Sequence, residues 1–105
     1  MKFEINGDIW TILEMTNEEL LNKYGEEDDT FLYGFCEYPT NKIYLVKEQS
    51  IQQKRNTLRH ELTHCWLFES GYGFRDNYSK EEVCNISACI NHFINKVVRD
   101  YFKNK

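Results

Sequence analysis

A chain of 105 residues, of which 41% are hydrophobic and 15% aromatic, is long enough for one domain with one modest core. Its formal net charge is -4, and no block of Lys and Arg could follow a phosphate backbone, so we expect no nucleic acid ligand. The amino terminus lacks the apolar core of a signal peptide, and no run approaches the ~18 apolar residues of a membrane span. We therefore expect a cytoplasmic protein without a membrane partner.

Two short strands are predicted first, in residues 3–5 and 9–13, where apolar and β-branched side chains flank an Asn-Gly pair. Thr16 and Glu19 then form a capping box before a short apolar face, which predicts a helix of about two turns. The acidic run at residues 26–29 is interpreted as a solvated loop, with metal binding as the alternative.

A second hairpin is predicted next. Residues 31–38 and 42–47 are rich in β-forming side chains and are separated by a Pro-Thr-Asn turn. Ser50 with Gln53 then offers another capping box, which opens a helix that ends near Ser70. This helix directs three large apolar side chains toward the core: Leu58, Leu62 and Trp66.

A long final helix is predicted to begin at Ser79, which forms a capping box with Glu82. Its apolar stripe consists of Val83, Ile86, Ile90, Phe93, Ile94, Val97 and Tyr101. Strands early in the chain and helices late indicate an α+β protein. We expect a minimal fold over residues 1–105, in which a small antiparallel sheet packs with the central helix and the long C-terminal helix.

The most informative motif is His60-Glu61-Leu62-Thr63-His64, an HExxH pentapeptide that falls in the middle of the central helix. One helical turn returns residue i+4 to nearly the same face as residue i, so both imidazoles can reach one tetrahedral Zn²⁺. Glu61 then lies beside the metal as the candidate catalytic base.

A catalytic zinc normally takes three protein ligands and leaves the fourth position to water. We choose Glu81 as the third metal ligand, because a Gly-rich loop lets the final helix fold back against the HExxH helix. Glu82 is the rival, but its capping role after Ser79 would hold it away from the metal. Asn85, one turn beyond Glu81, is placed to hydrogen-bond a ligand histidine.

The four cysteines are Cys36, Cys65, Cys84 and Cys89. They include no CxxC pair and lie among apolar or aromatic residues, so we interpret them as reduced, buried thiols. A cysteine-based structural zinc is the alternative, although residues 84 and 89 would point to different faces of a helix. Cys65 follows His64 directly and points away from it, which favours packing over metal binding, with a redox or inhibitory role as the alternative.

Three other segments, together with the HExxH helix, resemble the sequences of a known group of proteins. These are residues 6–10, the hairpin end at residues 43–46, and the run Glu81-Glu82-Val83-Cys84-Asn85. Together they resemble the small zincin-like metallopeptidases of phages and mobile elements, which are related to ImmA/IrrE-type and SprT-like proteins. In the gluzincin pattern of such enzymes the third ligand is a Glu followed four residues later by Asp or Asn, as in Glu81 and Asn85. Cys84 replaces the alanine that often precedes that Asn in ImmA/IrrE-type proteins.

The resemblance implies a zincin-like fold and a zinc metallopeptidase that hydrolyses peptide bonds of a protein substrate, with Glu61 as general base for a zinc-activated water. A substrate chain would lie along the edge strand of the second hairpin by β-addition. The candidate transition-state donors are Tyr72, Arg75, Tyr78 and His92.

Two further readings compete with a peptidase. The first is a non-catalytic zincin-like module that keeps the metal for stability, fills the fourth coordination position with Cys65 or another side chain, and binds a protein partner through its apolar final helix. The second treats HExxH as a coincidence in a metal-free interaction domain.

Overall fold

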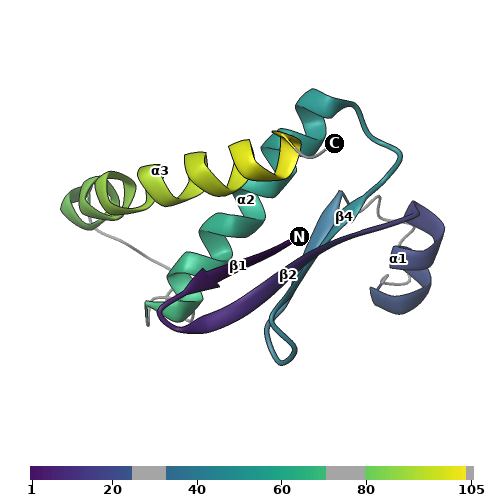
Figure 1. The fold of residues 1–105 in the computed structure, drawn as a ribbon, viewed down its shortest axis with the longest axis horizontal. Helices are drawn as coiled ribbons and strands as arrows, with labels where there is room; N and C mark the ends of the chain where they lie inside the picture. The colour runs from purple at the N-terminus through teal and green to yellow at the C-terminus, as the bar shows by residue number, and fades with distance from the viewer. Residues whose placement is uncertain (25–32, 71–79, 104–105) are drawn as a thin grey trace.

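The computed structural model describes residues 1–24, 33–70 and 80–103, with the backbone alone at residues 24 and 80–89. The elements follow the predicted order, with strands early and two long helices late, which confirms the α+β class (Figure 1). In chain order they are β1 (Lys2–Ile5), β2 (Asp8–Met15), α1 (Asn17–Tyr24), β3 (Gly34–Glu37), β4 (Lys42–Val46), α2 (Ile51–Glu69) and α3 (Lys80–Lys103).

The turn between β1 and β2 has the backbone geometry that its Asn-Gly pair predicts. Asn6 has φ 50° and Gly7 has φ 89°, so both residues lie in the left-handed region that a tight hairpin turn needs. The two strands pair antiparallel, with Phe3 opposite Trp10. The second predicted hairpin also forms, because β3 and β4 pair antiparallel.

The four strands form one mixed sheet in the order β1-β2-β4-β3. The expected sheet was antiparallel throughout, whereas its central pair, β2 and β4, is parallel. Residues 16–41, which include α1 and β3, supply the long crossover that parallel neighbours require. The turn signals determine the pairing within each hairpin, but they contain no information on how two hairpins join.

Side chains cap two of the helices as predicted. At α1 the amide of Glu19 donates to Thr16 Oγ1 at 3.1 Å, and the amide of Thr16 donates to Glu19 Oε1 at 3.4 Å. At α2 the amide of Gln53 donates to Ser50 Oγ at 3.0 Å. The predicted cap of α3 at Ser79 lies outside the described residues.

The main core lies between the sheet and the helices α2 and α3, which cross on the same side of the sheet in Figure 1. It contains Trp10, Ile43, Leu58 and Leu62, each with 0% of its surface exposed, and Trp66 packs against it. Four residues of the apolar stripe on α3 are also buried here: Ile90, Ile94, Val97 and Tyr101. Phe93 of the same stripe packs against this core and is partly buried. A smaller cluster under α1 consists of Leu20, Tyr44 and Val46.

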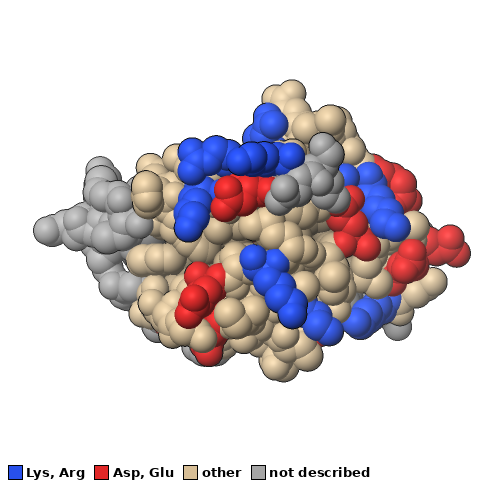
Figure 2. Space-filling model, in the orientation of Figure 1, with Lys and Arg blue, Asp and Glu red and all other residues tan. Residues whose placement is uncertain are grey.

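Charges of both signs are intermixed on the molecular face that Figure 2 shows. Within the described segments, no helix has the length and apolar character needed to cross a membrane.

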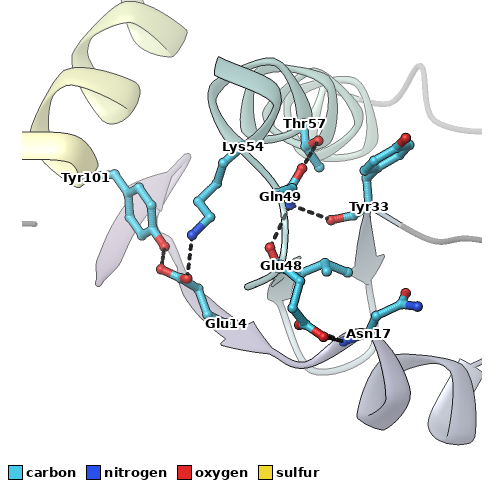
Figure 3. Close-up of polar contacts among 9 residues, drawn as sticks. Glu14, Asn17, Tyr33, Glu48, Gln49, Lys54, Thr57 and Tyr101 are labelled. Carbon is cyan, nitrogen blue, oxygen red and sulfur yellow. Dashed lines mark hydrogen bonds and ion pairs between the residues drawn. The ribbon is translucent and has the colours of Figure 1, made fainter. Parts of the chain in front are cut away.

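A polar cluster joins three elements near the start of α2 (Figure 3). Lys54 Nζ of α2 lies 2.8 Å from Glu14 Oε1 of β2, and the hydroxyl of Tyr101 on α3 donates to the other oxygen of the same carboxylate. The Lys54 and Glu14 side chains are only 15% and 14% exposed. A pair so shielded from water holds its partners more firmly than a surface ion pair.

Loss of the Tyr101 hydroxyl should therefore destabilise the fold. Tyr101→Phe removes one hydrogen bond to a shielded carboxylate, and we expect about 1.5 kcal/mol less free energy of unfolding in urea titrations. In a double-mutant cycle with Glu14→Gln, the cost of Tyr101→Phe should shrink. An equal cost in both backgrounds would show that the hydroxyl stabilises the protein by some other contact.

Candidate metal centre

Helix α2 brings His60 and His64 together as their spacing predicts. The two Nε2 atoms are 3.1 Å apart, and the rings meet edge to face with centroids separated by 4.6 Å. Two imidazole ligands of one tetrahedral zinc, each bound at 2.0–2.1 Å, have nitrogens roughly 3.3 Å apart. The described side chains therefore converge as a shared metal requires.

Both histidines are exposed at the surface of α2, so an ion can reach them from solvent. Partial burial lowers the pKa of His64, and the nearby His60 lowers it further. A lowered pKa favours the neutral imidazole, which is the form that binds metal.

Glu61, which follows His60 and points about 100° around the helix from it, lies against β3 and is only 7% exposed. Burial raises its pKa from 4.5 to about 7, because the charged carboxylate loses solvation there. This carboxyl is thus placed close to the histidine pair, in a setting where it exchanges a proton near neutral pH.

Strand β3 lies directly over Glu61. A Cβ atom added to Gly34 would be 2.7 Å from Thr57 Cγ2 and 3.6 Å from Glu61 Cγ. Only glycine allows the strand backbone to approach α2 this closely. The strand is also an edge of the sheet, with β4 as its neighbour.

The edge of β3 presents two backbone positions to a further strand. The amide of Val46 donates to Tyr33 O at 2.9 Å, and the register then places Phe35 opposite Tyr44 in the next hydrogen-bonded pair. Because the pairs alternate in an antiparallel ladder, the N–H and C=O groups of Gly34 and Cys36 point away from β4.

A hydrogen-bond network fastens the beginning of β3 to α2 (Figure 3). The Gln49 amide Nε2 donates to Tyr33 O at 3.0 Å and to Val46 O at 2.8 Å. Its Oε1 accepts from the Thr57 hydroxyl at 3.0 Å. Thr57 is one helical turn before Glu61, so the network holds the strand beside the motif.

Two hollows flank the motif, and Gly34 and Glu61 line both. One hollow, of about 430 Å³, extends past His64 along β3 to Pro39. The other, of about 400 Å³, extends past His60 to Gln53, near the start of α2. Together they form a groove along the edge strand, with Glu61 at its middle.

The family model for the IrrE N-terminal-like domain, a peptidase family, matches residues 14–95. The chain belongs to this family. No curated protein and no solved structure matches it. The family assignment supports a metallopeptidase-type domain of the ImmA/IrrE type.

The IrrE-like domain has its predicted third ligand outside the described side chains. Glu81 falls in the first turn of α3, where only the backbone is described, and the same holds for Glu82 and Asn85. Among the described side chains, no three His, Cys, Asp or Glu residues cluster as a metal site. Glu81 stays a prediction.

Cys36 and Cys65 are free, buried thiols, as expected, with their sulfurs 3.4 Å apart. The hydrogen bond to Cys36 and burial raise the pKa of Cys65, which makes it unreactive. Because its sulfur lies against β3 in the core while His64 is exposed, Cys65 is packed rather than turned toward the histidines. The side chains of Cys84 and Cys89 lie outside the described ones.

The candidate transition-state donors stay predictions. Tyr72, Arg75 and Tyr78, like the acidic run at residues 26–29, lie outside the described residues, and His92 is exposed on α3.

Sequence reasoning missed the residues that place the strand against the helix, namely Gly34, Gln49 and Thr57. A glycine inside an otherwise apolar, aromatic strand is a signal of close backbone approach, and it could have identified Gly34. Gln49 carries no such signal, because its contacts depend on the fold.

A methyl group at Gly34 should force β3 away from α2. We expect Gly34→Ala to lower the free energy of unfolding by about 1–3 kcal/mol, because the new Cβ overlaps Thr57 Cγ2. Thr57→Ser deletes that methyl, so the double variant should recover part of the loss in denaturant titrations. If Gly34→Ala lowers the free energy of unfolding equally in wild type and in Thr57→Ser, overlap with the Thr57 methyl group is not the cause.

The buried Glu61 carboxyl predicts a pH-dependent stability of the metal-free protein. Its pKa is raised from 4.5 to about 7 on folding, so its stabilising protonated form is fully present below pH 4.5 and is lost as the pH rises through 7. In chelator, the stability of Glu61→Gln relative to wild type should increase by on the order of 3 kcal/mol between pH 4 and pH 8.

Urea titrations at both pH values measure this difference. Glu4→Gln, at an exposed position on β1, is the matched control and should show no comparable change. Parallel pH dependences for wild type and Glu61→Gln would contradict the burial of this carboxyl.

Proposed function

We propose that the chain is a zinc-dependent metallopeptidase that hydrolyses peptide bonds of a protein substrate. One observation carries the proposal: two converging imidazoles and a buried carboxyl lie on one helix, at the middle of a groove that follows a sheet edge. Membership of a peptidase family supports it.

In this proposal His60, His64 and Glu81 hold the metal. Bound Zn²⁺ would supply Lewis acidity, polarising a carbonyl and lowering the pKa of a water. Glu61 takes up a proton and returns it to the leaving amine, which suits a carboxyl whose burial raises its pKa to about 7.

A substrate chain would bind as an extra strand beside β3. The outward N–H and C=O groups of Gly34 and Cys36 would pair with its backbone, and Gly34 would place the bound peptide close to Glu61. Recognition of this kind depends mainly on an extended conformation of the substrate.

The non-catalytic alternative relied on an apolar final helix that is free to bind a partner. The described residues of that stripe pack into the chain's own core, where all but the partly buried Phe93 are buried, so they offer no extended apolar face to a partner. A zinc site with all four positions filled by protein would still favour this alternative.

Metal analysis with matched activity assays tests the proposal. We expect about one zinc per chain after purification, lost in His60→Ala/His64→Ala and weakened in Glu81→Gln. Glu61→Gln should keep the metal and lose roughly 10²-fold or more in peptide hydrolysis, because only the proton transfer is removed. Quenched extended peptides would serve as substrates.

The outcomes separate the readings. Zinc that binds without any hydrolysis, or hydrolysis that persists in Glu61→Gln, would refute the peptidase mechanism. Absence of zinc even after resupply would remove both metal-based functions.

A further inference from the structure

The two halves of the groove differ in chemistry. The half beyond His64 is lined by β3 and the following turn, where Tyr38 and Pro39 supply apolar side chains. The half beyond His60 is lined by Tyr33 and by three residues of α2 whose side chains carry amides or a hydroxyl: Gln53, Asn56 and Thr57. A bound strand would therefore meet a different surface on each side of Glu61.

The apolar half has a rigid wall. The Tyr38 ring stacks on Phe68 with centroids 4.6 Å apart and meets Trp10 edge to face at 6.3 Å. Neighbours on two sides thus hold the ring in place, so it can pack against an apolar substrate side chain without first becoming ordered.

The polar half is aligned with the metal ligands. Asn56, His60 and His64 are four residues apart in turn, so they occupy successive turns on one face of α2. One turn rises about 5.4 Å, close to the roughly 6.6 Å between alternate side chains of a strand. The metal would lie between His60 and His64, so Asn56 is about 9 Å from it along the helix. A strand that runs along α2 would then bring to Asn56 a residue about three positions from the bond at the metal.

Asn56 is exposed and has a side-chain amide available for such a residue. Among the described residues, this amide makes no hydrogen bond. Its neighbours differ: Gln53 Nε2 donates to Thr57 Oγ1 at 3.3 Å, and the Thr57 hydroxyl is engaged with Gln49 and the backbone.

We propose that Asn56 is a specificity-determining residue, which selects a polar substrate side chain on the His60 side while the Tyr38 wall selects an apolar side chain on the His64 side. The inference rests on the proposed peptidase function. The expected substrate is an extended segment that is apolar on one side of the scissile bond and polar on the other.

Charges of opposite sign introduced at Asn56 test this assignment. Asn56→Asp should favour Lys or Arg at the facing substrate position, and Asn56→Lys should favour Asp or Glu there. At low salt, each preference should change roughly tenfold in kcat/KM between Lys-containing and Glu-containing peptides. Asn22→Asp and Asn22→Lys, at an exposed position on α1, are matched controls and should leave the preference unchanged.

The probes are fluorescent extended peptides in which each position is varied in turn. Cleavage is measured with the zinc-loaded protein, and binding is measured by anisotropy with Glu61→Gln. The binding measurement tests the side-chain preferences of the groove separately from peptidase activity. Peptides that bind with the expected preferences but are never cut would refute the peptidase function and support the groove assignment.

Three results would overturn the assignment: equal charge preferences in the Asn56 and Asn22 variants, a wild-type preference for apolar side chains on both sides, or no binding and no cleavage of any peptide. Opposite preferences in Asn56→Asp and Asn56→Lys, together with an apolar preference at the other position, would support it.

Discussion

The close approach of β3 to α2 at Gly34 is the constraint on which the candidate metal centre depends. The gap leaves no room for a side chain, since a Cβ there would be 2.7 Å from Thr57 Cγ2. At this point β3 covers Glu61, and a hollow opens on each side of that residue. The position of β3 also sets the depth at which a bound strand would lie. Gln49 maintains the approach by bonding to Tyr33 O and Thr57 at once. A short edge strand, paired with β4 and tied to α2 by Gln49, thus defines the site as much as the HExxH motif does.

The same approach separates the two tasks of the motif. His60 and His64 are exposed on α2, where a metal can reach them from solvent, while Glu61 between them is 7% exposed. Successive residues of a helix point about 100° apart, so one pentapeptide can hold two exposed imidazoles and one shielded carboxyl. The pKa of about 7 for Glu61 follows from its position under β3, not from the motif as such.

Local signals predicted the elements and the histidine pair correctly, because capping boxes, an Asn-Gly turn and i, i+4 spacing act within a few residues. The parallel pairing of β2 and β4 was missed, since it depends on how a long crossover folds. Gln49 and the Cys36–Cys65 contact escaped notice for the same reason: each joins residues that only the assembled fold brings together. Glu81 is predicted from its place in the sequence and the gluzincin pattern, and its side chain is outside the described ones.

The segments outside the family match support the site without lining it. The match spans residues 14–95, so Trp10 lies before it. Its Nε1 donates to Glu69 Oε1 at 2.9 Å near the end of α2. Near its start, Tyr101 and Lys54 share the Glu14 carboxylate. The described lining of the groove comes entirely from residues 33–64. Both ends of α2 are therefore braced from the sheet side by polar contacts to β2. These contacts fix the helix to the sheet that carries β3, and a metal site with ångström tolerances requires such support.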